Sequence, residues 1–247
     1  MRILGIRVDE AHGAEALAMI MGRLALPRES RGFSQVVTLN PEGLMLARED
    51  GELRRILEEA ALVTPDGNGL LWAAKKLGRP LRERVTGIDL IDQLAKAAAA
   101  EQRSLYLLGA RPGYAELAAE ALQSRYPGLI VSGVENGYFQ DREPAILDAL
   151  VQAEPDILLA ALGMPYQEKW LHRHGRELQG MVALGVGGSF DVLAGKVKRA
   201  PKLWQKLKLE WLWRLLADPK RWRRYLAIPR VLRAVQGEAR QNKTIKK

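Results

Sequence analysis

The chain has 247 residues, 47% of them hydrophobic, and carries a formal net charge of +9 at neutral pH. This length and apolar content suffice for a sizeable hydrophobic core and exclude a disordered protein. The absence of cysteine excludes disulfides, thiolate nucleophiles and cysteine-based zinc sites.

The first residues, "MRILGIRVDEAHGAE", do not resemble a targeting segment, because acidic residues follow too early for a signal peptide. No window of the sequence offers the ~18 apolar residues that a membrane-spanning helix needs. We therefore expect a cytoplasmic protein.

The middle of the chain alternates strand-length apolar runs with helix-length segments. Several runs are apolar on both faces, which is typical of parallel strands covered by helices on both sides. We therefore predict an α/β fold with an open, mostly parallel, Rossmann-like sheet and helices on both faces. The expected strands cover residues 35–40, 61–67, 104–110, 129–134, 156–164 and 181–188, and the expected helices include 41–50, 68–77 and 111–126.

Polar residues gather where the predicted strands end. Thr38 and Asn40 close one strand, Asp66 follows the next, and three further ends carry "LGARPG", "LGMPYQEKW" and "GVGGSFD". The carboxyl ends of parallel strands form the ligand crevice of an open sheet, because helix N-termini there present unpaired N–H groups. We therefore predict a ligand site at this edge. For Asp66 taken alone, the ordinary role is an N-cap of the following helix.

The glycine-rich turns give weaker signals. Gly109 in "LGARPG" and Gly187 and Gly188 in "GVGGSFD" could bring backbone N–H groups against a phosphate, but plain tight turns explain them as well. Neither a G-x-G-x-x-G fingerprint nor a P-loop occurs, which argues against a nicotinamide-dependent oxidoreductase. No Asp-x-Asp is present and the three histidines lack partners, so we expect no metal and no cofactor.

The last 52 residues differ in composition from the rest. Residues 196–247 hold 17 Lys or Arg against three acidic residues, a net +14, whereas residues 1–195 hold 21 against 26, a net −5. Four of the six tryptophans lie in this tail. The change falls at "AGKVKRAPK", so we predict an α/β domain over residues 1–195 and a basic, Trp-rich helical appendage over residues 196–247. Its helices should break near Pro219 and Pro229.

This appendage allows three interpretations. Its isoelectric point, near 9.8 for the whole chain, fits a nucleic-acid-binding protein, and a solvated pair of amphipathic helices is always possible. The broad apolar and aromatic face mixed with Lys and Arg favours an anionic membrane surface over a DNA groove. A subunit interface of a homo-oligomer could also cover the apolar face.

Seven stretches, in this order, resemble the WecG/TagA/CpsF family of bacterial glycosyltransferases, also called glycosyltransferase family 26. They run from residue 38 to residue 225, and an ordered set of this kind is highly specific. The stretches are "TLNPEG", "TPDGNGL", "ERVTGIDLI", "YLLGARPG", "LGMPYQEKW", "GVGGSFDVLAGKVKRAP" and "LEWLWRLLADPKRWRRY".

The resemblance implies an inverting, metal-independent transfer of N-acetylmannosamine, or a related sugar, from a UDP donor to a polyprenyl-diphosphate-linked N-acetylglucosamine. The reaction would occur at the cytoplasmic face of the plasma membrane, in the synthesis of teichoic acid, enterobacterial common antigen, capsule or exopolysaccharide. Asp66 would be the catalytic base with Thr38 beside it, and the appendage would dock on the membrane and bring arginines over the site. A nucleic-acid-binding protein that uses the basic tail is the alternative. The expected substrate-binding residues are Asn40, Arg84, Gly109, Gly163, Gln167, Gly187, Gly188, Asp191, Arg214, Arg221 and Arg224.

Overall fold

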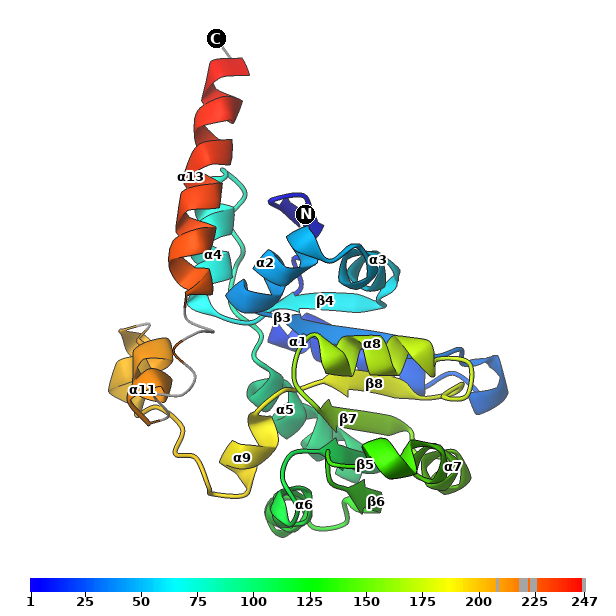
Figure 1. The fold of residues 1–247 in the computed structure, drawn as a ribbon. Helices are drawn as coiled ribbons and strands as arrows, with labels where there is room; N and C mark the ends of the chain where they lie inside the picture. Colours follow the sequence, from blue (N-terminus) through cyan, green and yellow to red (C-terminus); the bar gives the residue numbers. More distant parts are fainter. Residues whose placement is uncertain (208, 218–221, 223–225, 246–247) are drawn as a thin grey trace.

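The computed structural model describes residues 1–207, 209–217, 222 and 226–245, and its centre is a six-stranded sheet (Figure 1). All neighbouring strands of this sheet are parallel, and their order is β4-β3-β8-β7-β5-β6. The strands are β3 (Ser34–Leu39), β4 (Leu62–Pro65), β5 (Ser104–Gly109), β6 (Ile130–Glu135), β7 (Ile157–Ala161) and β8 (Val182–Gly185).

Helices cover both faces of the sheet (Figure 1). Successive strand residues point to opposite faces, so Val36 packs into the apolar cluster on one side and Val37 into the cluster on the other. On the side of Val36 lie α1 (Gly13–Leu24), α5 (Gly87–Ala100), α6 (Tyr114–Arg125) and α9 (Ser189–Leu193). The clusters of the opposite side include α2 (Pro41–Glu49), α3 (Gly51–Glu59), α4 (Asn68–Lys76), α7 (Glu143–Ala153) and α8 (Tyr166–Arg173).

The predicted fold class is confirmed, and a strand lies within each predicted apolar run or overlaps it. The strands are shorter than several of these runs. β4 ends at Pro65 and β8 at Gly185, and the residues that follow turn over the edge of the sheet. The sequence pattern did not predict the short antiparallel pair β1 (Arg2–Ile3) and β2 (Ile6–Arg7), nor the 3-10 turns η1 (Arg28–Ser30) and η2 (Gln140–Arg142).

The segment between β3 and β4 forms two helices where one was predicted. Asn40 caps α2, and Pro41 occupies its first turn, where a missing N–H costs no hydrogen bond. Asp50 ends this helix and caps α3, because its carboxylate accepts from the backbone N–H groups of Glu52 and Leu53. This break lets both helices pack on the same side of the sheet.

The described part of the tail consists of α10 (Lys202–Lys206), α11 (Glu210–Ala217) and α13 (Ala227–Ile245). The expected break near Pro219 lies outside the described residues. Pro229 stands in the first turn of α13, where a proline is tolerated, so the helix boundary falls just before it. α13 runs alongside α4 and then extends away from the body (Figure 1).

One face of α13 is part of the core. Ala227, Val231 and Val235 are buried in the cluster that contains Leu44 of α2 and Leu70 of α4. The end of the tail therefore covers apolar surface of the α/β domain, although it is separated from that domain in sequence by α10 and α11.

Candidate active site

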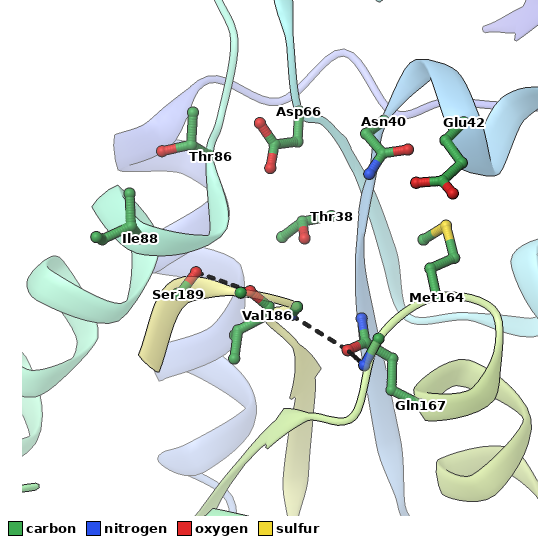
Figure 2. A pocket seen from close by; sticks show the side chains of 13 residues that line it. Thr38, Asn40, Glu42, Asp66, Thr86, Ile88, Met164, Gln167, Val186 and Ser189 are labelled. Carbon is green, nitrogen blue, oxygen red and sulfur yellow. Dashed lines mark hydrogen bonds between the residues drawn. The ribbon is translucent and has the colours of Figure 1, made fainter. Parts of the chain in front are cut away.

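A pocket opens at the carboxyl ends of four neighbouring strands, β4, β3, β8 and β7 (Figure 2). The segments that follow these strands, together with the start of α5, form its walls. The lining residues are Thr38, Asn40, Glu42, Asp66, Thr86, Ile88, Gly163, Met164, Gln167, Val186, Gly187, Gly188 and Ser189.

The strand order explains why a pocket forms here. After β3 the chain enters α2, whose Leu44 packs on one face of the sheet. After the neighbouring β8 it enters α9, whose Phe190 packs on the opposite face. Two adjacent strands whose connections leave toward opposite faces open a crevice between their ends, and ligands of open α/β sheets bind in such crevices.

Asp66 and Thr38 come from adjacent strands. Thr38 lies opposite Thr64 in the parallel register of β3 and β4, and the backbone N–H of Asp66 donates to the carbonyl of Leu39 at 2.7 Å. Figure 2 shows both side chains turned into the same space. The Thr38 hydroxyl donates to the Gly185 carbonyl at 2.9 Å, so its oxygen can act only as an acceptor toward a ligand.

Asp66 is not the N-cap of α4. The capping position belongs to Gly67, which has a φ of 115° and offers no side chain for a capping hydrogen bond. The left-handed region is open to glycine without strain, and this turn places the half-buried Asp66 one residue before the helix, on the pocket wall. The capping interpretation of this aspartate therefore does not describe its position.

Two helix N-termini end at the pocket. Asn40 caps α2 by accepting from the Gly43 N–H at 2.8 Å, and Figure 2 shows its amide nitrogen on the side of Thr38. Thr86 caps α5, and Gly87 stands so close to Thr38 and Ser189 that a Cβ there would meet their hydroxyls at 3.4–3.5 Å. The positive ends of two helix dipoles at one pocket favour a negatively charged ligand.

Gln167 holds two of the glycine turns together. Its Oε1 accepts from the backbone N–H groups of Gly163 and Gly187, each at 3.1 Å. These two N–H groups are therefore used within the protein and do not point at a ligand, contrary to the phosphate-binding role considered from the sequence for the turn that contains Gly187. Gly188 lines the pocket and is the N-cap of α9.

Arg84 lies next to the pocket but not among its lining residues. The neighbouring Val85 donates its N–H to the carbonyl of Pro65, which fixes this segment beside the end of β4. The Arg84 guanidinium forms an ion pair with Glu210 of α11, and both side chains are largely buried. The tail therefore reaches the region of the pocket through this pair.

Two further expected residues lie outside the pocket lining. Gly109 has a φ of 130°, and a Cβ there would come within 2.5 Å of the Ala161 backbone, so this glycine permits the close approach of β5 and β7. Asp191 lies in α9, and its carbonyl accepts from the N–H groups of residues 196 and 197. Among the tail arginines, Arg221 and Arg224 lie outside the described residues, and for Arg214 only the backbone, in α11, is described.

Sequence reasoning missed several lining residues, including a second pocket carboxylate, Glu42. The family resemblance could have pointed to two of them, because Glu42 lies in the matching stretch "TLNPEG" and Thr86 in the matching stretch "ERVTGIDLI". Thr86 also stands three residues before Asp89, the spacing of a helix cap. The other missed residues are Ile88, Met164, Val186 and Ser189.

The described residues contain no group of three or more His, Cys, Asp or Glu side chains able to hold a metal ion. His172 and His174 instead pair with Glu59 and Glu143, and His12 caps α1. Within the same residues, no helix combines the length and the apolar composition needed to cross a membrane.

Comparison with known proteins gives the family. The model of the glycosyl transferase WecG/TagA/CpsF family matches residues 1–245. The chain belongs to this family. It is therefore a glycosyltransferase.

Curated relatives carry a more specific name, N-acetylglucosaminyldiphosphoundecaprenol N-acetyl-beta-D-mannosaminyltransferase. The relative from Bacillus spizizenii is 36% identical over 81% of this chain and 77% of its own length. The relative from Bacillus subtilis is 34% identical over 85% of this chain and 81% of its own. The one from Staphylococcus aureus is 34% identical over 92% of this chain and 88% of its own. These WecG/TagA/CpsF relatives thus match 81–92% of this chain.

Proposed function

We propose that this glycosyltransferase moves N-acetylmannosamine, or a related sugar, from a UDP-sugar to N-acetylglucosamine linked to a polyprenyl diphosphate. The names of the relatives, which state this sugar and a lipid-linked acceptor, support the proposal. The observation that carries it is the placement of Asp66 and Thr38 at neighbouring strand ends in one pocket. The product would serve cell-wall polymer synthesis, as a teichoic acid linkage unit or an exopolysaccharide.

Asp66 acts as the general base. Its carboxylate takes the proton of the acceptor hydroxyl as that oxygen attacks the anomeric carbon of the donor sugar. The bond between this carbon and the UDP oxygen breaks on the opposite side, so the configuration inverts and UDP leaves with the bonding electrons. Positioned general bases accelerate reactions by ~10²–10⁴-fold. Thr38, with its hydroxyl proton held by Gly185, accepts a hydrogen bond from the sugar.

The leaving diphosphate gains negative charge, which this reaction must stabilise without a metal ion. The N-termini of α2 and α5 supply positive dipole ends at the pocket. Arg84, beside the pocket, offers its guanidinium to the diphosphate in competition with its partner Glu210, and the tail arginines Arg214, Arg221 and Arg224 add positive charge when the lipid-linked acceptor is bound. Gln167 shapes the pocket by holding its glycine turns.

The tail brings the enzyme to an anionic membrane surface on the cytoplasmic side. The described part of residues 203–226 exposes six large apolar side chains beside the many cations of the tail. Aromatic and aliphatic groups enter the headgroup region, and each Lys or Arg near an anionic leaflet adds about 1 kcal/mol of attraction. The exposed apolar residues are Leu203, Leu207, Trp211, Leu216, Trp222 and Leu226.

The function is tested by a screen of UDP-sugars with a short-chain N-acetylglucosaminyl diphospholipid, measuring UDP release in excess EDTA. We expect UDP-N-acetylmannosamine or a close relative to be used, and chelation to leave the rate unchanged. Activity that EDTA abolishes and Mg²⁺ or Mn²⁺ restores would contradict the metal-independent reaction.

The membrane role needs a separate test. Co-sedimentation with phosphatidylglycerol vesicles should weaken when Leu216 and Trp222 are both replaced by serine. A DNA shift assay of the wild-type protein is run at the same salt concentration for comparison. Tight DNA binding without vesicle binding would support the nucleic-acid alternative.

A further inference from the structure

Next to the pocket, a fully buried acidic side chain takes no part in the chemistry proposed above. Glu168 is 0% exposed, and its carboxylate contacts the Gln167 amide: Gln167 Nε2 donates to Glu168 Oε1 at 2.7 Å. The second oxygen, Oε2, has no hydrogen-bond partner in the described part of the chain. Burial raises the pKa of this carboxyl to about 7. Burying a carboxyl group with one unpartnered oxygen is costly, so its presence here requires an explanation.

The hydrogen bonds of Gln167 indicate what Glu168 does. The Gln167 oxygen accepts two backbone N–H groups, from Gly163 after β7 and Gly187 after β8. The amide nitrogen must then point the other way, toward Glu168. A flipped amide would place its NH₂ group against two N–H donors, so an acceptor at Glu168 selects the orientation that joins the two turns.

The fold leaves room for this pair at one specific point. Gly185, the last residue of β8, has no side chain, and a Cβ there would lie 2.5 Å from Gln167 Nε2 and 2.8 Å from Glu168 Oε1. α8 is also fixed to β3, because Gln35 Nε2 donates to the Glu168 carbonyl at 3.0 Å. Glu168 is thus held at a set distance from the strand whose Thr38 lines the pocket.

We propose that Glu168 is a positioning residue for sugar transfer: it orients the Gln167 amide, which holds the Gly163 and Gly187 turns and so sets the pocket beside Thr38 and Asp66. This inference rests on the proposed function. Glu168 itself is not among the pocket-lining residues, so it acts through Gln167 and not on the substrate.

An exchange of the two side-chain types tests the proposal. Gln167→Glu alone places two carboxyl groups against each other, and we expect kcat to fall at least about tenfold as the turns shift. In the double variant Gln167→Glu/Glu168→Gln, the new carboxylate can accept from both glycine N–H groups and from the new amide. Its kcat should return to within about threefold of the wild type. A double variant no better than Gln167→Glu would overturn the proposal.

A second pair of variants covers the case in which Gln167→Glu does not fold. Glu168→Gln keeps an acceptor for the Gln167 amide and should keep activity, whereas Glu168→Leu removes the acceptor and should lose it. Equal activity of these two variants would also refute the positioning role. Lys169→Met is the matched control on the same helix, because Lys169 pairs with Asp50 and Glu52 away from the pocket.

A readout independent of activity separates this inference from the proposed function. In hydrogen exchange followed by NMR, the Gly163 and Gly187 amides should exchange faster in Glu168→Leu than in Glu168→Gln. If the wild type transferred no sugar but the exchange pattern held, the proposed reaction would fail and the positioning network would stand. Unchanged exchange in Glu168→Leu would contradict the network itself.

Discussion

Replacing Asp66 by asparagine should reduce turnover by at least about 10²-fold with almost no change in the free energy of unfolding. A general base contributes ~10²–10⁴-fold, or about 3–5 kcal/mol of transition-state stabilisation. Loss of a helix cap would cost ~1 kcal/mol of folding stability, but Gly67 and not Asp66 occupies the capping position of α4. The backbone hydrogen bond from Asp66 to Leu39 persists in the variant, because it does not involve the side chain.

The assay is UDP release with a short-chain lipid acceptor, paired with a chemical denaturation curve. Glu42→Gln removes the other pocket carboxylate and shows whether any loss of charge in the pocket has the same effect. Asp92→Asn, on the exposed side of α5, controls for the substitution itself. Near-normal turnover of Asp66→Asn, or a larger loss in Glu42→Gln, would refute the assignment of the base.

Three further predictions follow from contacts around the site. Glu210→Gln should lower the KM for the UDP donor up to about fivefold, because the Glu210 carboxylate competes with the diphosphate for Arg84. Steady-state kinetics measure this, and a raised KM would mean that Glu210 instead positions Arg84. Val235→Ala should cost about 2 kcal/mol of unfolding free energy, since Val235 is fully buried on the face of α13 that packs against α2 and α4; superimposable denaturation curves would contradict this. Folding favours protonated Glu168, so stability should fall as pH rises from 4.5 to about 7, and the melting temperature of Glu168→Gln should lack this fall.

The α/β fold was predictable because buried parallel strands leave a strong local signal. Runs such as "SLYLLGA" and "DILLAALGM" are apolar on both faces, and each contains one strand. The second of the two helices between β3 and β4 was not predicted, because the boundary between them is made by a side-chain cap, Asp50, inside a continuous helical pattern. The packing of α13 depends on Val231 and Val235 meeting α2 and α4, a contact between distant segments that no local pattern encodes.

The part of the site that depends only on where parallel strands end could be predicted from the sequence. Thr38 and Asp66 each follow an apolar run, so a parallel sheet brings them to one edge, and β3 and β4 are indeed neighbours. The pairing of Arg84 with Glu210 joins residues 126 positions apart and requires the docked tail. The use of the Gly163 and Gly187 N–H groups by Gln167 depends on a side-chain conformation, which spacing along the chain does not determine.

The most direct test of inverting transfer in the Asp66 pocket is the anomeric configuration of the first product. The enzyme is incubated with α-linked UDP-N-acetylmannosamine and a short-chain N-acetylglucosaminyl diphospholipid, and the new linkage is examined by proton NMR before any equilibration. A single attack by the acceptor hydroxyl, with Asp66 as base, predicts a β-linked disaccharide formed with one equivalent of UDP. An α-linked product, or a sugar attached covalently to the protein during turnover, would contradict it.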